Sequence, residues 1–183
     1  MNAHSIPPEL EAVVASDESV ESKLSNLIVL LGEALRCDRC LLFLRDPRTR
    51  RSYNSHGWTR RPEYALKQTR ESWSQEPVSL ADDDPMFALA LRDPNALYIE
   101  DIETAGPDVL NRDYERDLFG HRALIHAPIY YQDLMFGIFE PCVFCKPRQW
   151  TEFDRAVTVW AQTKLGPMAA EYVALHCPDD SES

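Results

Sequence analysis

The apolar positions near the start of the chain have helical spacing. Between about Val20 and Arg36 they recur at every third or fourth residue, which predicts one amphipathic helix. The residues of this stripe are Leu24, Leu27, Ile28, Leu31, Ala34 and Leu35. A shorter helix is predicted over Pro7–Val14, where proline occupies the first position. Two helices are therefore expected before the first strand.

Short apolar runs bounded by turn residues predict the strands of a sheet. The two best defined of these runs are separated by Gln132-Asp133, which is the strongest hairpin signal in the sequence. The predicted strands are Cys40–Leu44, Arg51–Gly57, Leu97–Glu100, Ala123–Tyr130 and Leu134–Phe139. With helices before and after them, they favour a single α/β (α+β) domain.

Polar caps mark the later helices. Asp84 precedes a proline and an apolar run, which predicts a helix with Asp84 as its N-cap. Thr151, with Asp154 three residues on, predicts the start of a long helix by a short version of the capping box. Gly166-Pro167 is expected to kink or break that helix before a last segment that ends near Leu175.

The charge balance narrows the classes of partner. The 183 residues include 30 acids and 19 bases, a formal net charge of -11. Nucleic-acid binding needs cationic groups that displace counterions from phosphates, and anionic membrane surfaces attract the same groups. We therefore expect no nucleic-acid partner and no membrane insertion. A secretory signal is not recognised in Met1–Pro7, so a cytoplasmic protein is expected, with reduced thiols or metal ligands for its five cysteines.

Several stretches together resemble one family of sensor modules. They are Cys37–Phe43, Tyr98–Ile102, Gly120–Ile129, Leu134–Ile138 and Lys146–Trp150 followed by Phe153-Asp154. In this order they resemble the GAF family, and the last stretch is similar to its bilin-binding branch of phytochromes and cyanobacteriochromes. The likeness covers about residues 20–175. It implies a GAF-like antiparallel sheet flanked by helices, with the N- and C-terminal helices packed together on one face.

The resemblance places a GAF-like domain at residues 20–176, which leaves residues 1–19 as an N-terminal extension. Residues 177–183 are expected to form a disordered tail, because the end of the chain is polar and acidic. In the bilin-binding branch, the thiol that attaches the chromophore precedes the strand that begins at Gly120. The corresponding residues 109–119 contain no cysteine. A thioether needs a thiol, so a covalent bilin at that position is excluded, whereas noncovalent binding stays open.

A ligand pocket is expected on the sheet face away from the long helices. The aromatic candidates for its wall are Trp58, Tyr64, Trp73, Phe87 and Tyr98. The resemblance adds Arg122 and His126, because basic and aromatic residues near this strand hold propionates and ring nitrogens in bilin-binding relatives. The alternative is that the aromatic residues belong to the core, that Arg122 pairs with an acid such as Asp101, and that His126 is a satisfied core histidine.

Two C-x-x-C pairs, Cys37/Cys40 and Cys142/Cys145, suggest a second site. If the first and last strands are antiparallel neighbours, as in a GAF sheet, both pairs lie at one sheet edge. Four thiolates there could ligate zinc or an iron–sulfur cluster. In the alternative interpretation each cysteine packs as a small apolar residue.

The leading hypothesis is a stand-alone, non-enzymatic sensory or regulatory domain that binds a small ligand and acts through protein–protein contact. Apolar residues outside the main stripes, Leu30, Val159 and Trp160, favour a homodimer and a protein partner. A GAF branch that reduces free methionine sulfoxide would need a reactive cysteine over the pocket. Two alternatives stay open: a metal or iron–sulfur redox sensor that uses the cysteine quartet, and an adaptor or assembly factor with no ligand.

Overall fold

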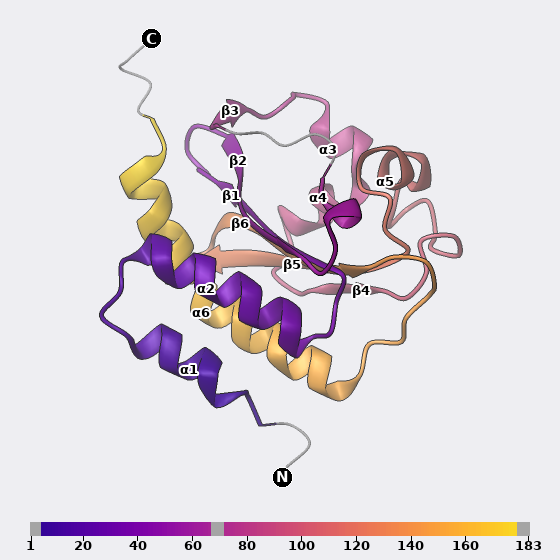
Figure 1. The fold of residues 1–183 in the computed structure, drawn as a ribbon. Coiled ribbons are helices and arrows are strands. Elements are labelled where there is room, and N and C mark those ends of the chain that lie inside the picture. The colour runs from indigo at the N-terminus through magenta and orange to yellow at the C-terminus, as the bar shows by residue number, and fades with distance from the viewer. Residues whose placement is uncertain (1–4, 67–71, 179–183) are drawn as a thin grey trace.

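The computed structural model describes residues 5–66 and 72–178, which form a six-stranded antiparallel sheet flanked by helices (Figure 1). The sheet order is β3-β2-β1-β6-β5-β4. The strands are β1 (Arg39–Arg45), β2 (Arg51–Thr59), β3 (Ser74–Gln75), β4 (Leu97–Ile99), β5 (Ala123–Tyr131) and β6 (Leu134–Val143). The helices are α1 (Pro8–Ala15), α2 (Val20–Ala34), the 3-10 turn η1 (Pro62–Tyr64), α3 (Leu80–Asp83), α4 (Pro85–Ala90), α5 (Arg112–Leu118) and α6 (Glu152–His176). The α+β architecture expected from the sequence is confirmed.

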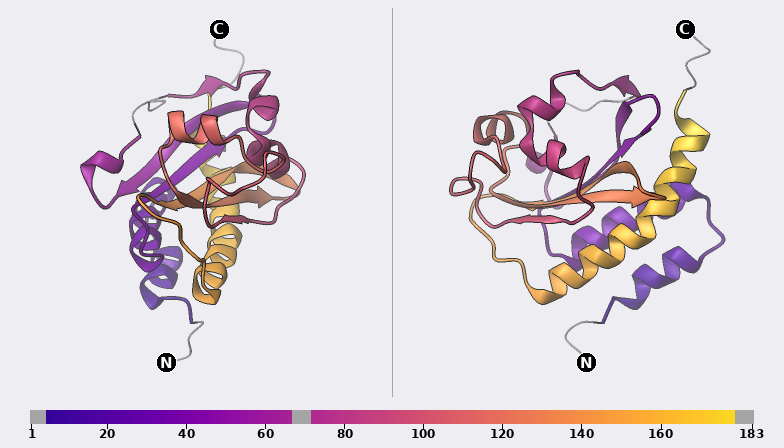
Figure 2. Two further views of the ribbon diagram at one scale, coloured as in Figure 1. Left: turned by 90° about the vertical axis from the view of Figure 1, so that its right-hand side faces the viewer. Right: turned by 180° about the vertical axis from the view of Figure 1, so that it is seen from behind.

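The helices divide into two layers on opposite faces of the sheet (Figures 1 and 2). The long helices α2 and α6 pack together on one face, with α1 against α2. We call the side chains between these helices and the sheet the helix-side core. The short helices α3, α4 and α5 cover the other face, which we call the distal face. Residues Ala123–Ile129 of β5 are all buried because both faces of this strand are covered.

Local sequence signals explain how several elements begin and end. The Asp84 carboxylate accepts the backbone N–H of Phe87 at the start of α4, as predicted for an N-cap. Thr151 and Asp154 form a complete capping box at the start of α6. Gln132 and Asp133 both have positive φ, 49° and 63°, which gives the two-residue turn of the β5–β6 hairpin a twist that matches its strands.

The expected break at Pro167 is wrong, because α6 continues through it to His176. A proline inside a helix removes one backbone hydrogen bond. Burial of Leu165, Gly166, Met168 and Ala169 on both sides of the proline maintains the helix through tertiary packing.

The first and last long strands lie side by side, which brings the two C-x-x-C segments together as expected. Arg39 is the register partner of Cys142, and Cys40 is the partner of Pro141. The backbone N–H of Asp38 also donates to the Cys142 carbonyl at 2.9 Å. The adjacency of these segments, on which the cysteine hypothesis depended, is therefore confirmed.

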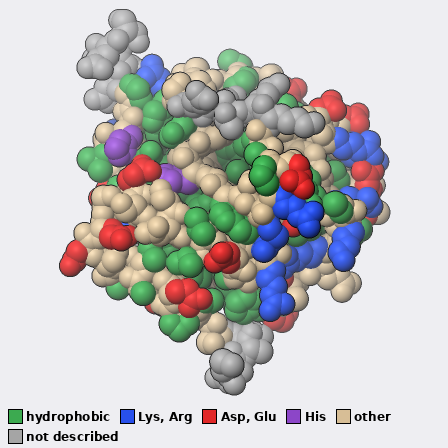
Figure 3. Space-filling model, in the orientation of Figure 1, with side chains coloured by type: hydrophobic (Ala, Val, Ile, Leu, Met, Phe, Trp, Pro, Cys, Tyr) green, Lys and Arg blue, Asp and Glu red, His purple; other side chains and the backbone are tan. Residues whose placement is uncertain are grey.

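The two ends of the chain relate differently to this domain. Leu10 of α1 is fully buried, so the helix within the N-terminal extension is packed against α2. Of the predicted disordered tail, residues 179–183 lie outside the described residues, and the Pro178 carbonyl accepts a hydrogen bond from Arg51. Among residues 5–66 and 72–178, no helix combines the length and apolarity needed to cross a membrane. Figure 3 shows Lys and Arg side chains gathered at the right of one molecular face.

Candidate functional site

A cavity of about 360 Å³ lies on the distal face, between the sheet and the short helices. We call it the distal cavity. Its floor is formed by the central strands, and its cover comes from α3, α4 and α5. The apolar lining residues are Phe43, Leu44, Leu66, Leu80, Met86, Phe87, Leu118, Phe119, Met135 and Ile138. The polar and ionisable lining residues include Arg45, Ser52, Asn54, Glu76, Asp84, Tyr114, Glu115, His126 and Glu140.

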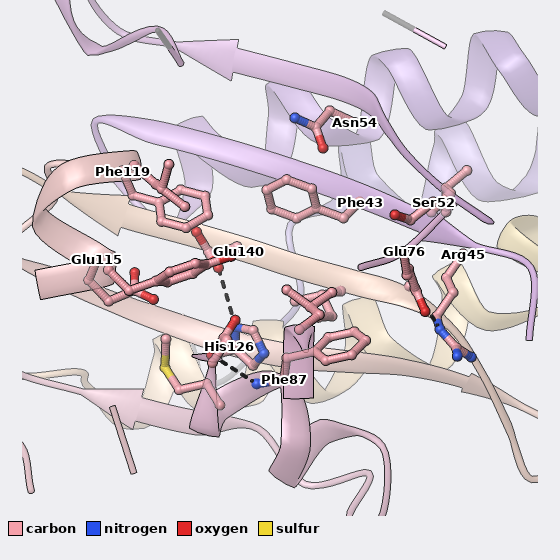
Figure 4. Close-up of a pocket in the computed structure, with 18 of the residues that line it drawn as sticks. Phe43, Arg45, Ser52, Asn54, Glu76, Phe87, Glu115, Phe119, His126 and Glu140 are labelled. Carbon is pink, nitrogen blue, oxygen red and sulfur yellow. Dashed lines mark hydrogen bonds and ion pairs between the residues drawn. The ribbon is translucent and has the colours of Figure 1, made fainter. Parts of the chain in front are cut away.

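The labelled side chains of Figure 4 approach this cavity from several elements. Phe43 comes from β1 and Phe119 from the end of α5, and their rings make an edge-to-face contact with centroids 6.3 Å apart. Phe87 of α4 lies beside His126, which projects from β5. The site combines an apolar wall with a few buried polar groups, as ligand pockets do.

A buried chain of hydrogen bonds begins behind the cavity at Arg39. Its guanidinium donates to the carbonyls of Tyr64 and Phe119 and contacts His121 Nδ1 at 3.3 Å. Because a guanidinium can only donate, His121 Nδ1 is the acceptor, and the ring proton is assigned to Nε2. His121 Nε2 then donates to Glu115 Oε2 at 2.8 Å.

Burial makes His121 and Glu115 a neutral pair. Desolvation lowers the pKa of His121 to about 4. Desolvation, with the nearby charges of Glu140 and Asp84, raises the pKa of Glu115 to about 9. At neutral pH a neutral imidazole therefore donates to a protonated carboxyl group, and the contact is a hydrogen bond rather than an ion pair.

Glu140 and His126 form a second pair at the cavity surface, in which each residue favours the charged form of the other. His126 Nδ1 lies 3.3 Å from Glu140 Oε2, and each residue is 3 % exposed. Burial opposes ionisation of both groups, but their hydrogen bond and mutual charge outweigh it. The pKa of Glu140 is therefore lowered and that of His126 is raised. Glu140 Oε1 and His126 Nε2 are buried without a hydrogen-bond partner.

The other end of the distal cavity contains an ion pair between Arg45 and Glu76. Arg45 Nε donates to Glu76 Oε1 at 2.8 Å, and the Glu76 side chain is 1 % exposed. Glu76 Oε2 has no hydrogen bond, although Arg50 Nε approaches it to 3.8 Å. The Arg45 side chain is therefore already neutralised by an acid within the cavity.

Two residues of the predicted pocket, Phe87 and His126, line the distal cavity. Three other predicted pocket residues pack against the helix-side core instead: Trp58, Trp73 and Tyr98. For Trp58 and Tyr98, the alternation of side chains along a strand explains why the prediction is wrong. Trp58 is the register partner of Cys40, and Tyr98 is the partner of Ile125. Both partners belong to the helix-side core, so these aromatic side chains share its face.

Tyr64 and Arg122 lie outside the distal cavity as well. The Tyr64 ring stacks on Phe144, with centroids 4.4 Å apart. Arg122 Nε and Nη2 donate to the two carboxylate oxygens of Asp101 at 2.6 and 3.0 Å. The alternative prediction of an Arg122–Asp101 pair is therefore confirmed. The alternative for His126 is wrong, because its Nε2 has no partner and the residue lines the cavity.

The four thiols of the cysteine quartet do not converge. Cys37 and Cys40 belong to the helix-side core, whereas Cys142 packs with Leu124 on the distal face and Cys145 is exposed. Adjacent strands align their backbones, but the alternation of side chains separates Cys40 from Cys142. Burial also raises the pKa of the Cys40 and Cys142 thiols, which disfavours the thiolates that bind metals. No group of three or more His, Cys, Asp and Glu side chains in the described parts of the chain could hold a metal ion.

Glu140 is the main cavity residue that sequence reasoning missed. The predicted strand ended at Phe139, which left Glu140 outside it, whereas β6 runs on to Val143. The available signal was an acid flanked by the apolar residues Ile138, Phe139 and Cys142. A carboxylate in such an apolar run is rarely buried without a partner, so an acid at this position indicates a candidate functional site.

The GAF domain family model matches residues 19–159. Among solved structures, the phycocyanobilin-bound GAF domain of a cyanobacterial phytochrome superposes with a TM-score of 0.70, at 17% identity over 95% of this chain and 100% of that one. The GAF domain of a phosphoenolpyruvate-protein phosphotransferase from Coxiella burnetii gives a TM-score of 0.68, at 18% identity over 92% of each chain.

A free methionine-R-sulfoxide reductase from Neisseria meningitidis, in complex with its substrate, gives a TM-score of 0.63. Its identity is 16% over 92% of this chain and 88% of that one. No curated protein sequence matches significantly. At these identities the structural likenesses establish the fold alone. The family match, which spans most of the chain, establishes that this protein belongs to the GAF domain family.

Proposed function

We propose that this GAF domain is a sensory or regulatory module that binds a small organic ligand in the distal cavity. The observation that carries the proposal is the cavity itself, about 360 Å³ in volume and lined by both apolar side chains and buried polar atoms. Membership of a family of generally sensory, ligand-binding domains supports the same conclusion.

The polar atoms of the cavity support ligand binding because they lack partners. Glu140 Oε1 and His126 Nε2 are buried without hydrogen bonds. A buried polar atom without a partner costs free energy, which a ligand with complementary groups would recover. The surrounding apolar wall would contribute affinity by removing the ligand's own apolar surface from water.

A non-enzymatic role is part of the proposal. The reductase likeness is a likeness of fold, at 16% identity. Methionine sulfoxide reduction by thiols needs a reactive cysteine, and no cysteine is present among the described residues that line the distal cavity. In the cavity His126 is paired with Glu140 and Arg45 with Glu76, which favours recognition of a ligand over chemistry on it.

The signal is proposed to leave the cavity through the central strands. Phe43 of β1 lines the cavity, while its neighbours Leu42 and Leu44 belong to the helix-side core. A shift of β1 on ligand binding would therefore be transmitted to α2 and α6 through the side chains packed between them. Output through these helices, to a second copy of the chain or to another protein, completes the proposed function.

The proposal is tested by mapping bound fragments with methyl NMR spectroscopy. Fluorinated fragments that include acids, bases and neutral compounds are screened, and hits are mapped on methyl signals of Met86, Met135 and Ile138 in the cavity. Leu27 and Val157 in the helix-side core serve as the internal control. Binding fragments should shift the cavity methyl signals first and most strongly. A screen in which no fragment shifts them would instead favour an adaptor without a ligand.

A cavity-filling variant provides the matched control. Ile138→Trp places a larger side chain in the distal cavity and should abolish the fragment-induced shifts. Val159→Trp enlarges an exposed position on α6, 57 % exposed, and should leave them unchanged. Equal binding to both variants would place the fragments outside the cavity.

A further inference from the structure

The distal cavity has more acids than bases among its described lining residues. The acids are Glu76, Asp84, Glu140 and the protonated Glu115, and the bases are Arg45 and His126, so the ionised acids still outnumber the bases. Both bases are already engaged, Arg45 with Glu76 and His126 with Glu140. Among the described lining bases, only His126 keeps a buried side-chain nitrogen, Nε2, without a hydrogen bond.

Two buried carboxylate oxygens of the described lining residues lack a hydrogen bond, Glu76 Oε2 and Glu140 Oε1. Arg50 Nε approaches Glu76 Oε2 to 3.8 Å, whereas no free donor approaches Glu140 Oε1 among the described residues. The other oxygen of the Glu140 carboxylate, Oε2, receives His126 Nδ1. His121 Nδ1 lies 3.9 Å from Oε1, but it accepts from Arg39 and carries no proton to donate. The local network therefore leaves one buried carboxylate oxygen of Glu140 without a hydrogen bond.

Aromatic rings line the cavity around and beyond the Glu140 carboxylate group, with Phe119 the nearest of the labelled ones. Figure 4 shows Phe119 next to the Glu140 carboxylate, with Phe43 and Phe87 farther along the same cavity. Aromatic faces carry negative electrostatic potential and attract cations within about 6 Å of the ring centroid. A carboxylate beside phenylalanine rings is therefore suited to a ligand that is flat, apolar and positively charged.

We propose that the distal cavity binds a compact organic cation with a flat apolar body, whose N–H group donates to Glu140 Oε1. This inference rests on the proposed function, because it assigns a ligand class to the same cavity. The cation completes the hydrogen bonds of Glu140 and offsets the surplus of acids. A ligand whose recognition depends on a phosphate or carboxylate would meet these acids, and His126 Nε2 is the one buried nitrogen of the described lining bases left to pair with it.

The test uses three probes of nearly equal shape and different charge on the whole chain: benzamidine (a cation), benzamide (neutral) and benzoate (an anion). Affinities are measured from the methyl shifts of Met86 and Met135 at 150 mM salt. Benzamidine should bind at least tenfold more tightly than benzamide, and benzoate should give no shifts in the cavity. This order is read from the native protein and does not depend on any variant.

Glu140→Gln keeps the shape of the side chain and removes its charge. It should weaken benzamidine at least tenfold while the affinity for benzamide changes by less than about threefold. Glu171→Gln, at an exposed position on α6, is the matched control and should leave all three probes unchanged.

The outcomes separate the two proposals. If benzamide or benzoate binds as tightly as benzamidine, the cation preference is overturned and the cavity stays a ligand site. If none of the three probes shifts a cavity signal at millimolar concentration, and the fragment screen is also silent, both proposals fail. If benzamidine binds the Glu140→Gln variant as tightly as the native protein, Glu140 is not its anchor.

Discussion

The side chains that distinguish this GAF domain are buried acids and bases whose charges are set by their neighbours. Glu115 and His121 share one hydrogen bond as neutral groups, whereas Glu140 and His126 each favour the charged form of the other. All four are at most 3 % exposed. Burial disfavours the charged form of all four residues. The two pairs differ in ionisation because nearby opposite charges offset the cost of burial for Glu140 and His126 but not for Glu115 and His121.

The buried Glu115 carboxyl group makes the stability of the protein depend on pH. The pKa of Glu115 is raised to about 9 in the folded protein, from an ordinary 4.5. Its contribution to stability is therefore complete below about pH 4.5 and is lost as the pH rises toward 9. In the Glu115→Gln variant the side chain cannot ionise, so this loss of stability with rising pH does not occur. The free energy of unfolding of the variant, relative to the native protein, should rise by roughly 2–4 kcal/mol between pH 5 and pH 8.

Urea unfolding at pH 5, 6.5 and 8 measures this difference directly. His121 acts in the opposite sense, because its lowered pKa of about 4 costs stability as the pH falls below 6.5. It does so in both proteins, so its effect largely cancels in the comparison. A constant difference between variant and native protein across this range would show that Glu115 is ionised in the fold.

Residue types alone could identify only part of this site. Phe87 and His126 were predicted for the pocket, and both line it. Trp58 and Tyr98 were assigned to the wrong face, because their direction depends on the register of neighbouring strands, which the sequence does not specify. The partners of Glu115 and Glu140 come from other elements, so their pKa shifts are a product of the tertiary fold.

At the scale of elements, glycine allows the longest helix to approach the sheet closely. A Cβ added to Gly166 of α6 would lie 2.5 Å from the backbone carbonyl oxygen of Tyr130 at the end of β5. Backbone atoms cannot move aside without shifting the strand. The contact therefore fixes the distance between α6 and the sheet.

Gly166→Ala should destabilise the protein even though alanine is the better helix former by about 1 kcal/mol. We expect a net loss of roughly 1–3 kcal/mol in the free energy of unfolding, the usual cost of overpacking. Gly106→Ala is the matched control, because its added Cβ would meet only the side-chain oxygen of Asp108. The free energies of unfolding of both variants and the native protein are measured by chemical denaturation. If Gly166→Ala is as stable as the native protein, α6 can move away from the sheet at no cost in free energy.

Periodicity identified the long helices and the central strands well because both faces of the sheet are covered. It predicted one end of β6 too early, since Glu140 and Pro141 interrupt the apolar run. It also predicted a break at Pro167, because local propensity does not include the packing of α6 against β5. The two-residue strand β3 has too short a pattern to recognise.

At the scale of the whole molecule, the outer surface of α2 and α6 is where contact with a partner was expected. The expected interface included Leu30, Val159 and Trp160. In the structure Trp160 Nε1 donates to Glu11 of α1, so part of this surface is used within the chain. Val159 and Val29 stay exposed on α6 and α2, at 57 % and 38 %.

We predict that a second copy of the chain binds over these exposed valines. Light scattering at high concentration should give twice the monomer mass of 21.0 kDa. Val159→Arg should shift the equilibrium to monomer by at least tenfold in dissociation constant. Val78→Arg, at a position 89 % exposed and outside these helices, should not. A native protein that stays monomeric at all concentrations rules out the homodimer.

The distal cavity is proposed as a ligand site anchored on Glu140. A crystal structure of the protein soaked with benzamidine tests this proposal. We expect a flat density between the phenylalanine rings of the cavity, with an amidinium nitrogen about 2.7–3.2 Å from Glu140 Oε1. A fully occupied benzamidine elsewhere on the molecule, with the cavity empty or its acids paired in some other way, would contradict it.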